Sequence, residues 1–112
     1  MIIITNGLKE VQRPRFERSS IHDLFESLIV SGEVGAAKPG PEIFDAAFDA
    51  IGNPPKSETL IIGDSLTSDM AGGISYGIDT CWYNPRAKER PAELEPTYEI
   101  RDLTDLVELL TI

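Results

Sequence analysis

The sequence predicts an α/β fold with a doubly wound parallel sheet and helices on both of its faces. Two observations indicate this class. Short runs of β-branched or aromatic residues alternate along the chain with helix-like apolar patterns, and the connections between them are short. Strands that alternate with helices pair in parallel through right-handed crossovers, and these crossovers place the helices on both faces of an open sheet.

Four short runs have the composition of strands that are buried on both faces. Each run is rich in β-branched or aromatic residues and lacks the polar alternation of a half-exposed strand. The runs are residues 2–5 (IIIT), 27–31 (SLIVS), 59–63 (TLIIG) and 79–83 (DTCWY). We expect these runs to form the parallel sheet.

The clearest helical pattern spans residues 41–51. Pro41 stands at its start, where a proline is tolerated because the first helical N–H groups have no partner within the helix. Phe44 and Phe48 lie four residues apart on one face, and Gly52 follows the last apolar position. This segment therefore predicts an amphipathic helix that packs on the sheet.

Three further segments have weaker helical patterns. They are residues 8–18, residues 68–76 and the apolar stripe of residues 103–110. Pro14 should kink or shorten the first, because it removes a backbone donor from the helix. Gly77 should end the second, and Asp102 is the expected N-cap of the third.

Composition narrows the classes of function. A chain of 112 residues is the size of one domain, and its formal net charge of −9 repels phosphate backbones and anionic lipid, so we expect neither a nucleic acid nor a membrane as partner. Divalent cations are attracted by the same charge. A single cysteine, Cys81, permits no internal disulfide, and neither a signal peptide nor a long apolar run is present. The expected location is the cytoplasm.

Polar residues follow three of the four predicted strands. They are Thr5, Asn6 and Gly7 after the first strand, Lys38 at the end of the loop after the second, and Asp64 and Asp69 after the third. In open parallel sheets, ligands bind beyond the carboxyl ends of the strands. We therefore expect these side chains to share one edge of the sheet.

These residue types can hold a phosphoryl group beside a metal ion. The hydroxyl of Thr5 and the amides of the two residues that follow it can donate to phosphate oxygens, and Lys38 can neutralise phosphate charge. Asp64 offers a hard oxygen to Mg²⁺, with Asp69 behind it, and Mg²⁺ is usually held by one or two carboxylates plus water and substrate oxygens. The predicted ligands are a small phosphorylated metabolite and Mg²⁺.

Each segment also has an ordinary structural explanation. "TNG" is typical of a turn at the end of a strand, "KPGP" is typical of the start of a helix, and "GDSLTSD" is typical of a turn before a capped helix. The three occur in order, each after a predicted buried strand. That conjunction favours the phosphate-binding hypothesis over three unrelated turns.

Three segments resemble motifs II, III and IV of the haloacid dehalogenase superfamily of phosphohydrolases. They are "IIITNG", "SGEVGAAKPGPEIFDAA" and "LIIGDSLTSDMAGGISYGIDTCWYN", which together extend over nearly the whole chain. The likeness is closest to the branch that contains 5′-nucleotidases and related phosphatases. It implies a Rossmann-like core with motif II on Thr5, beside Asn6, and motif III on Lys38, so that Thr5 and Lys38 are the implied catalytic residues. It places motif IV on Asp64 and Asp69, with Asp64 the more direct Mg²⁺ ligand.

Motif I and the cap domain of this family have no counterpart in the 112 residues. Motif I is a DxDx[TV] sequence whose first aspartate attacks phosphorus and whose second acts as acid and base, whereas this chain has no DxD and its first aspartate is Asp23. We therefore expect residues 1–112 to form a partial core domain that lacks the family's central strand. Such a chain should be inactive alone, and its exposed sheet edge should favour self-association.

Three hypotheses of function follow. The first is a Mg²⁺-dependent phosphohydrolase that, in its complete form, acts on a small phosphomonoester such as a nucleoside 5′-monophosphate through an aspartyl-phosphate. The second is a noncatalytic, truncated remnant that binds phosphate or metal, or only self-associates. The third is a receiver domain, which needs an acidic pair after the first strand and a lysine near the end. The order of residues in this chain does not fit the third.

Overall fold

The computed structural model describes residues 1–20, 22–25 and 27–110. The chain divides into two compact units, unit 1 (Met1–Pro54) and unit 2 (Pro55–Ile112), and each is described by itself. Both units have an α/β architecture with parallel strands, which confirms the predicted fold class. The expectation that residues 1–112 form one domain stays a prediction.

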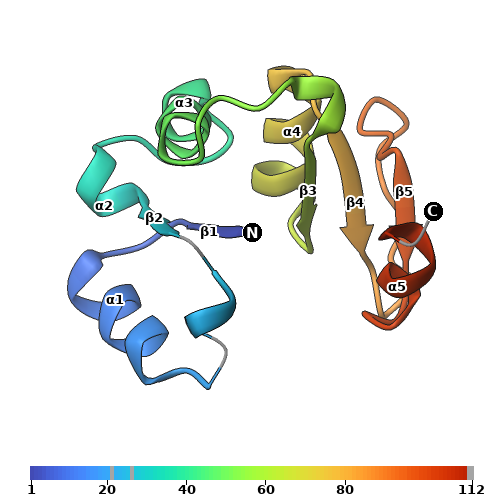
Figure 1. Ribbon diagram of the computed structural model, residues 1–112. Helices are drawn as coiled ribbons and strands as arrows, with labels where there is room; N and C mark the ends of the chain where they lie inside the picture. The colour runs from blue at the N-terminus through green and yellow to red at the C-terminus, as the bar shows by residue number, and fades with distance from the viewer. Residues whose placement is uncertain (21, 26, 111–112) are drawn as a thin grey trace. The chain divides into compact units, whose positions relative to one another are not determined.

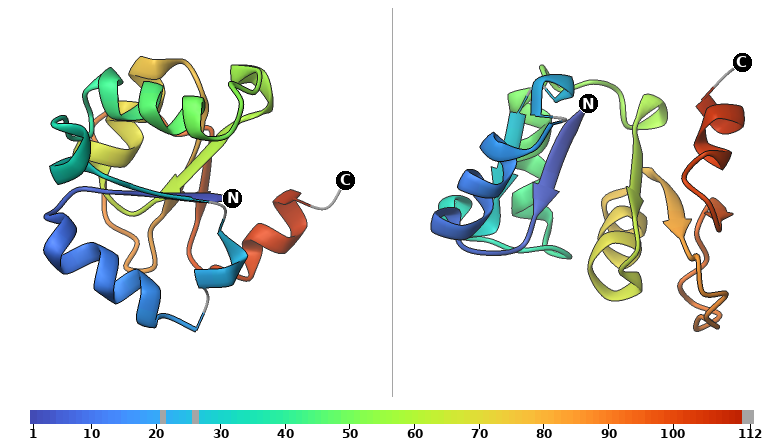
Figure 2. Two further views of the ribbon diagram at one scale, coloured as in Figure 1. Left: turned by 60° about the vertical axis from the view of Figure 1, so that its left-hand side comes forward. Right: turned by 90° about the horizontal axis from the view of Figure 1, so that it is seen from below.

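Unit 1 is built on a pair of parallel strands. Its elements are β1 (Ile2–Thr5), α1 (Lys9–Arg18), the 3₁₀ turn η1 (His22–Leu24), β2 (Ser27–Val30), α2 (Ser31–Val34) and α3 (Pro41–Ala50). The register pairs Ile2 with Ser27 and Thr5 with Val30, so β1 and β2 end together. Figures 1 and 2 show α1 and α3 on opposite faces of this pair.

The apolar face of α3 forms most of the core of unit 1. The helix begins at Pro41, as predicted, and ends before Gly52, whose φ of +83° is a left-handed conformation that favours glycine. Its buried side chains are Ile43, Phe44, Ala47 and Phe48. Leu28 and Val30 of β2 are also buried, and α3 contacts both strands. Burial of these side chains holds the helix on the sheet.

Unit 2 contains a parallel sheet in the order β3-β4-β5. Its elements are η2 (Lys56–Glu58), β3 (Leu60–Gly63), the π-helical turn η3 (Leu66–Met70), α4 (Ala71–Tyr76), β4 (Asp79–Tyr83), β5 (Tyr98–Ile100) and α5 (Asp105–Leu110). Strand β4 lies between its two neighbours (Figure 1) and buries Thr80, Cys81 and Trp82. Burial raises the pKa of the Cys81 thiol, so Cys81 acts as a neutral core side chain, as the sequence indicated.

Close backbone contacts position α4 on this sheet. A Cβ atom at Gly73 would lie 2.6 Å from the methyl carbons of both Ile61 and Thr80, so only glycine fits there. Thr80 also forms a reciprocal pair with Thr97, in which each backbone N–H donates to the other side-chain hydroxyl oxygen at 3.0 Å. This pair aligns the chain that leads into β5.

The expectations about individual helices were met in part. Pro14 does not shorten α1, which is continuous from Lys9 to Arg18, because the carbonyl that loses its donor belongs to exposed Glu10, where water can replace it. The expected kink stays a prediction. The capping role expected of Asp102 is confirmed, because its Oδ1 accepts the backbone N–H of Thr104 at 2.9 Å and its own N–H donates to Oδ2 of Asp105 at 3.3 Å. The turn that it opens leads into α5, which begins at Asp105. The predicted 68–76 helix begins earlier, as the turn η3, which Ser65 caps.

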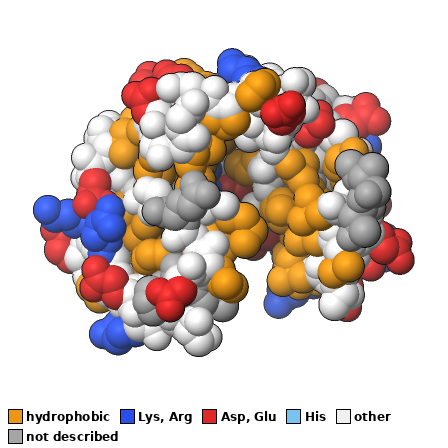
Figure 3. Space-filling model, in the orientation of Figure 1, with side chains coloured by type: hydrophobic (Ala, Val, Ile, Leu, Met, Phe, Trp, Pro, Cys, Tyr) orange, Lys and Arg blue, Asp and Glu red, His pale blue; other side chains and the backbone are white. Residues whose placement is uncertain are grey.

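The expected burial of strands on both faces holds only in part. Strand β4 is buried along its centre, but β1 is half-buried throughout, and Ile62 of β3 is 40% exposed. Within the described ranges, β1 pairs only with β2, and β3 pairs only with β4. A strand with a neighbour along one side keeps part of its apolar surface open. Figure 3 shows hydrophobic side chains at the surface on the face in view. In the part of the chain that the structure describes, no helix has the length and apolar character needed to cross a bilayer.

Candidate functional site

Asn6 joins two of the predicted site segments in unit 1. Its side-chain Nδ2 donates to the backbone O of Lys38 at 3.2 Å, and its Oδ1 accepts the backbone N–H of Lys38 at 2.9 Å. The Nζ of Lys38 donates to the backbone O of Ile4 at 3.1 Å. The loop after β1 and the loop that ends at Lys38 are therefore tied together, and the half-buried ammonium lies near the carboxyl end of β1.

Ser31 holds the turn at Gly7. The backbone N–H of Gly7 donates to Oγ of Ser31 at 2.8 Å, and that hydroxyl donates to the backbone O of Gly7 at 3.2 Å. Gly7 has a φ of +154°, and a Cβ there would lie 2.9 Å from Nε2 of Gln12. The sequence analysis proposed that the Gly7 N–H donates to a phosphate oxygen. In the structure this N–H already has an acceptor within the protein. Sequence reasoning missed Ser31, although its place directly after β2 was a usable signal.

Thr5 is half-buried at the end of β1. Its hydroxyl donates to the neighbouring backbone O of Asn6 at 3.4 Å, which is long for an O–H donor. Such a weak bond is easily exchanged for a bond to a phosphate oxygen. Thr5, Asn6, Gly7 and Lys38 thus form one polar cluster in unit 1, the Thr5–Lys38 cluster.

The two aspartates of unit 2 have different surroundings. Asp69 is 7% exposed, and its Oδ2 accepts the backbone N–H of Ser65 at 3.2 Å. Asp64 is exposed, and its backbone O accepts the indole N–H of Trp82 at 3.1 Å. The loop after β3 is therefore held from two sides. Asp69 positions this loop, while the carboxylate of Asp64 stays accessible to a ligand.

Gly63 leaves room for the Asp69 carboxylate. A Cβ on Gly63 would lie 2.7 Å from the Cβ of Asp69 and closer still to its carboxylate. We expect Gly63→Ala to displace Asp69, break the bond to Ser65 and lower the free energy of unfolding by about 1–3 kcal/mol. Urea denaturation measures the change. In a Gly63→Ala/Asp69→Gly double variant, which has no Cβ at position 69 to meet the new methyl group, the alanine at 63 should cost little. Full additivity of the two single changes would therefore contradict the proposed contact.

The residues after β3 fit a magnesium ion bound mainly through Asp64. Across residues 1–20, 22–25 and 27–110, no group of three or more His, Cys, Asp or Glu side chains is placed to hold a metal. Mg²⁺ does not need such a group, because it keeps several waters and is often bound by one or two carboxylates plus phosphate oxygens. The exposed carboxylate of Asp64, backed by the buried Asp69, meets that requirement. The predicted convergence of this pair with the Thr5–Lys38 cluster stays a prediction.

Comparison with known proteins identifies the family. Residues 35–106, more than half of the chain, match the HAD-hydrolase-like family. The chain belongs to this family of haloacid dehalogenase-like hydrolases, which confirms the resemblance seen in motifs II, III and IV.

Individual relatives are phosphatases and nucleotidases. The chain is 44% identical over 108 residues to pyrimidine 5′-nucleotidase YjjG of Escherichia coli strain K12, a stretch that covers 96% of this chain and 48% of that protein. It is 37% identical over 106 residues to pyrimidine 5′-nucleotidase PynA of Streptococcus pneumoniae, covering 95% of this chain and 45% of that protein. The chain thus spans about half the length of the curated relatives it matches.

A solved structure shows the same fold. The crystal structure of YfnB from Bacillus subtilis, a protein named as a HAD-hydrolase, superposes with a TM-score of 0.94 at 43% identity. The match covers 99% of this chain and 49% of YfnB, which was crystallised bound to magnesium. The fold of this chain is therefore that of a solved HAD-type core.

Proposed function

We propose that these 112 residues are part of a Mg²⁺-dependent phosphohydrolase that hydrolyses small phosphomonoesters. The proposal rests mainly on the two hydrogen bonds between the Asn6 side chain and the Lys38 backbone, called here the Asn6–Lys38 bridge. They hold the lysine ammonium beside the loop after β1. Two relatives are named as pyrimidine 5′-nucleotidases, at 44% and 37% identity. Pyrimidine nucleoside 5′-monophosphates are accordingly the first substrates to test.

The residues of this chain supply the binding half of the chemistry. The Lys38 ammonium and the Thr5 hydroxyl bind phosphoryl oxygens and stabilise the negative charge that these oxygens carry in the transition state. A magnesium ion held by Asp64 would supply positive charge to a phosphoryl group. Asp69 keeps the loop of Asp64 in place through Ser65. Asn6 acts as a positioning residue, since it fixes the backbone of Lys38.

The attacking group of the proposed reaction has to come from outside these residues. The 112 residues contain no DxD pair, so an aspartyl-phosphate intermediate needs an aspartate that they do not supply. We expect the whole protein to hydrolyse pyrimidine 5′-monophosphates only with Mg²⁺, and the 112-residue chain to show no turnover. Phosphate release measured with and without EDTA tests both. Metal-independent hydrolysis by the whole protein, or turnover by a chain of verified intact mass, would contradict this scheme.

A noncatalytic, self-associating role is the second candidate. It is favoured by the strand pairing, because along the described stretches β1 and β3 each pair on one side only. Unpaired strand edges can pair with another copy of the same chain. Light scattering of the 112-residue chain at micromolar concentration tests this role. A dimer mass would support it, and a folded monomer at every concentration would rule it out.

A further inference from the structure

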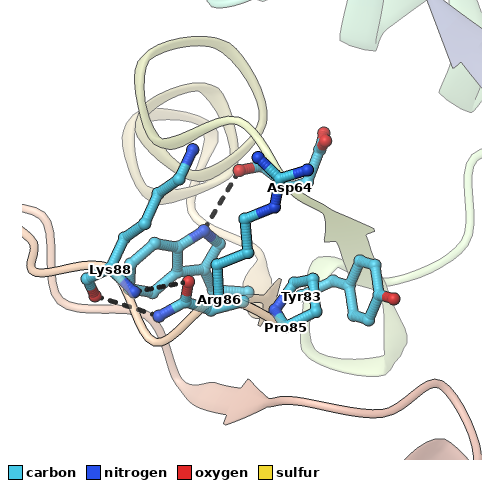
Figure 4. Close-up of a pocket in the computed structure, with 7 residues that line it drawn as sticks. Asp64, Tyr83, Pro85, Arg86 and Lys88 are labelled. Atoms are coloured by element: carbon cyan, nitrogen blue, oxygen red, sulfur yellow. Dashed lines mark hydrogen bonds between the residues drawn. The ribbon is translucent and has the colours of Figure 1, made fainter.

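Unit 2 contains a pocket of about 290 Å³ at the carboxyl ends of β3 and β4 (Figure 4). It is lined by Asp64, by residues 82–86 and by Lys88. The indole of Trp82 forms part of its wall and donates to the backbone of Asp64, so the loops that follow the two strands are joined there. The candidate metal carboxylate therefore belongs to the same pocket as the residues after β4.

Asn84 gives the loop after β4 a defined shape. This side chain is 2% exposed, and its Nδ2 donates to the backbone O of Lys88 at 3.0 Å and to Oε2 of Glu99 at 2.9 Å. Its Oδ1 accepts the backbone N–H of Lys88 at 3.0 Å. Ala87 lies between them in the left-handed region, with a φ of +53°. The buried amide thus closes residues 84–88 into a loop of fixed geometry.

This loop presents two cations to the pocket. The side chains of Arg86 and Lys88 extend from the loop towards the level of Asp64 (Figure 4). Both side chains are exposed. Among residues 1–20, 22–25 and 27–110, neither the Arg86 guanidinium nor the Lys88 ammonium forms an ion pair or a side-chain hydrogen bond. The pocket thus has two cations and one carboxylate in a chain whose net charge is −9.

We propose that this pocket is a binding site for a small oxyanion, phosphate or carboxylate, held by Arg86 and Lys88. A planar guanidinium and an ammonium are the side chains that bind such anions through charge-assisted hydrogen bonds. The volume is roughly ten times the ~30 Å³ that a water molecule occupies, and it lies at the lower end of the range for ligand pockets. It therefore suits a hydrated anion, or one anionic group of a larger ligand.

The site goes beyond the proposed hydrolysis, because that reaction uses neither Arg86 nor Lys88. A cation bound by Asp64 would strengthen the site, since it would offset the charge of the one acidic side chain among the described residues that line the pocket. Phosphate affinity should therefore rise when Mg²⁺ is added. It should fall when sodium chloride is raised, because exposed charges are screened by salt.

The test is a titration of the 112-residue chain with inorganic phosphate, followed by NMR signals of the Trp82 indole N–H and of the Arg86 guanidinium. Saturable shifts of both signals are expected. Arg86→Gln and Lys88→Gln should each weaken binding about tenfold, and Arg86→Lys should restore part of the loss. Arg101→Gln, an exposed arginine of unit 2 outside the pocket, is the matched control. Absence of shifts, or equal losses in the control, would overturn the proposal.

Two probes separate a free anion from an anionic group of a larger ligand. Methylphosphonate has one anionic group, and phosphonoacetate has a carboxylate as well. Equal affinities of the pocket for the two probes would indicate a site for a free anion. Tighter, Mg²⁺-dependent binding of phosphonoacetate would indicate a site for the second anionic group of a larger ligand. Hydrolysis by a whole protein whose pocket binds neither probe would refute this site and leave the proposed function standing.

Discussion

Asp64→Asn should lower the Mg²⁺-dependent hydrolysis of the whole protein by about 100-fold or more, because it removes the accessible anionic oxygen proposed to bind the ion. The fold should change little, since Asp64 is exposed and its bond with Trp82 uses the backbone O, which asparagine keeps. Measurements of kcat/KM against Mg²⁺ concentration, with calorimetric titration of Mg²⁺ into the protein, test the expectation.

Asp79→Asn is a suitable control for that change. Asp79 is an exposed aspartate of the same unit at the opposite end of β4 from the pocket, and its replacement removes the same charge. Both variants should unfold within about 0.5 kcal/mol of the parent, as surface substitutions usually do. Turnover of Asp64→Asn close to that of Asp79→Asn would remove Asp64 from the metal site.

Lys38→Ala should lower kcat/KM by about 100-fold, because it removes the ammonium proposed to stabilise the transferring phosphoryl group. The structure adds a cost to stability, since the Nζ of Lys38 donates to the backbone O of Ile4. Loss of such a bond should lower the free energy of unfolding by about 0.5–1.5 kcal/mol. The Asn6 bridge should survive, because it uses only the backbone of Lys38.

Kinetics and thermal unfolding of the same samples separate the two effects of this change. Lys9→Ala, which removes an exposed lysine of unit 1, should leave both kcat/KM and the melting temperature unchanged. A Lys38→Ala protein with full activity and a strongly lowered melting temperature would make this lysine a structural residue. Full activity with an unchanged melting temperature would remove it from both roles.

Local chemistry was enough to predict the principal elements. Runs such as residues 2–5 and 79–83 form strands because β-branched and aromatic side chains suit a pleated, buried surface. Helix α3 begins at Pro41 because proline tolerates the first helical position and the apolar spacing that follows faces the strands. The polar candidate site residues were found because they follow the predicted strands along the chain. All of these signals lie within a few residues of the feature that they predict.

Features that depend on distant partners could not be predicted in this way. Strand β5 has only residues 98–100 and exists through its pairing with β4, so no local periodicity marks it. The family resemblance implied that Asp64 is the more direct metal ligand, but it could not show that Asp69 is buried beside Gly63 and bonded to Ser65. The bond from the Asn84 amide to Glu99 joins residues 15 positions apart, and no local pattern marks that partner. Burial and hydrogen bonding across long sequence separations are decided by packing, which the tertiary structure alone determines.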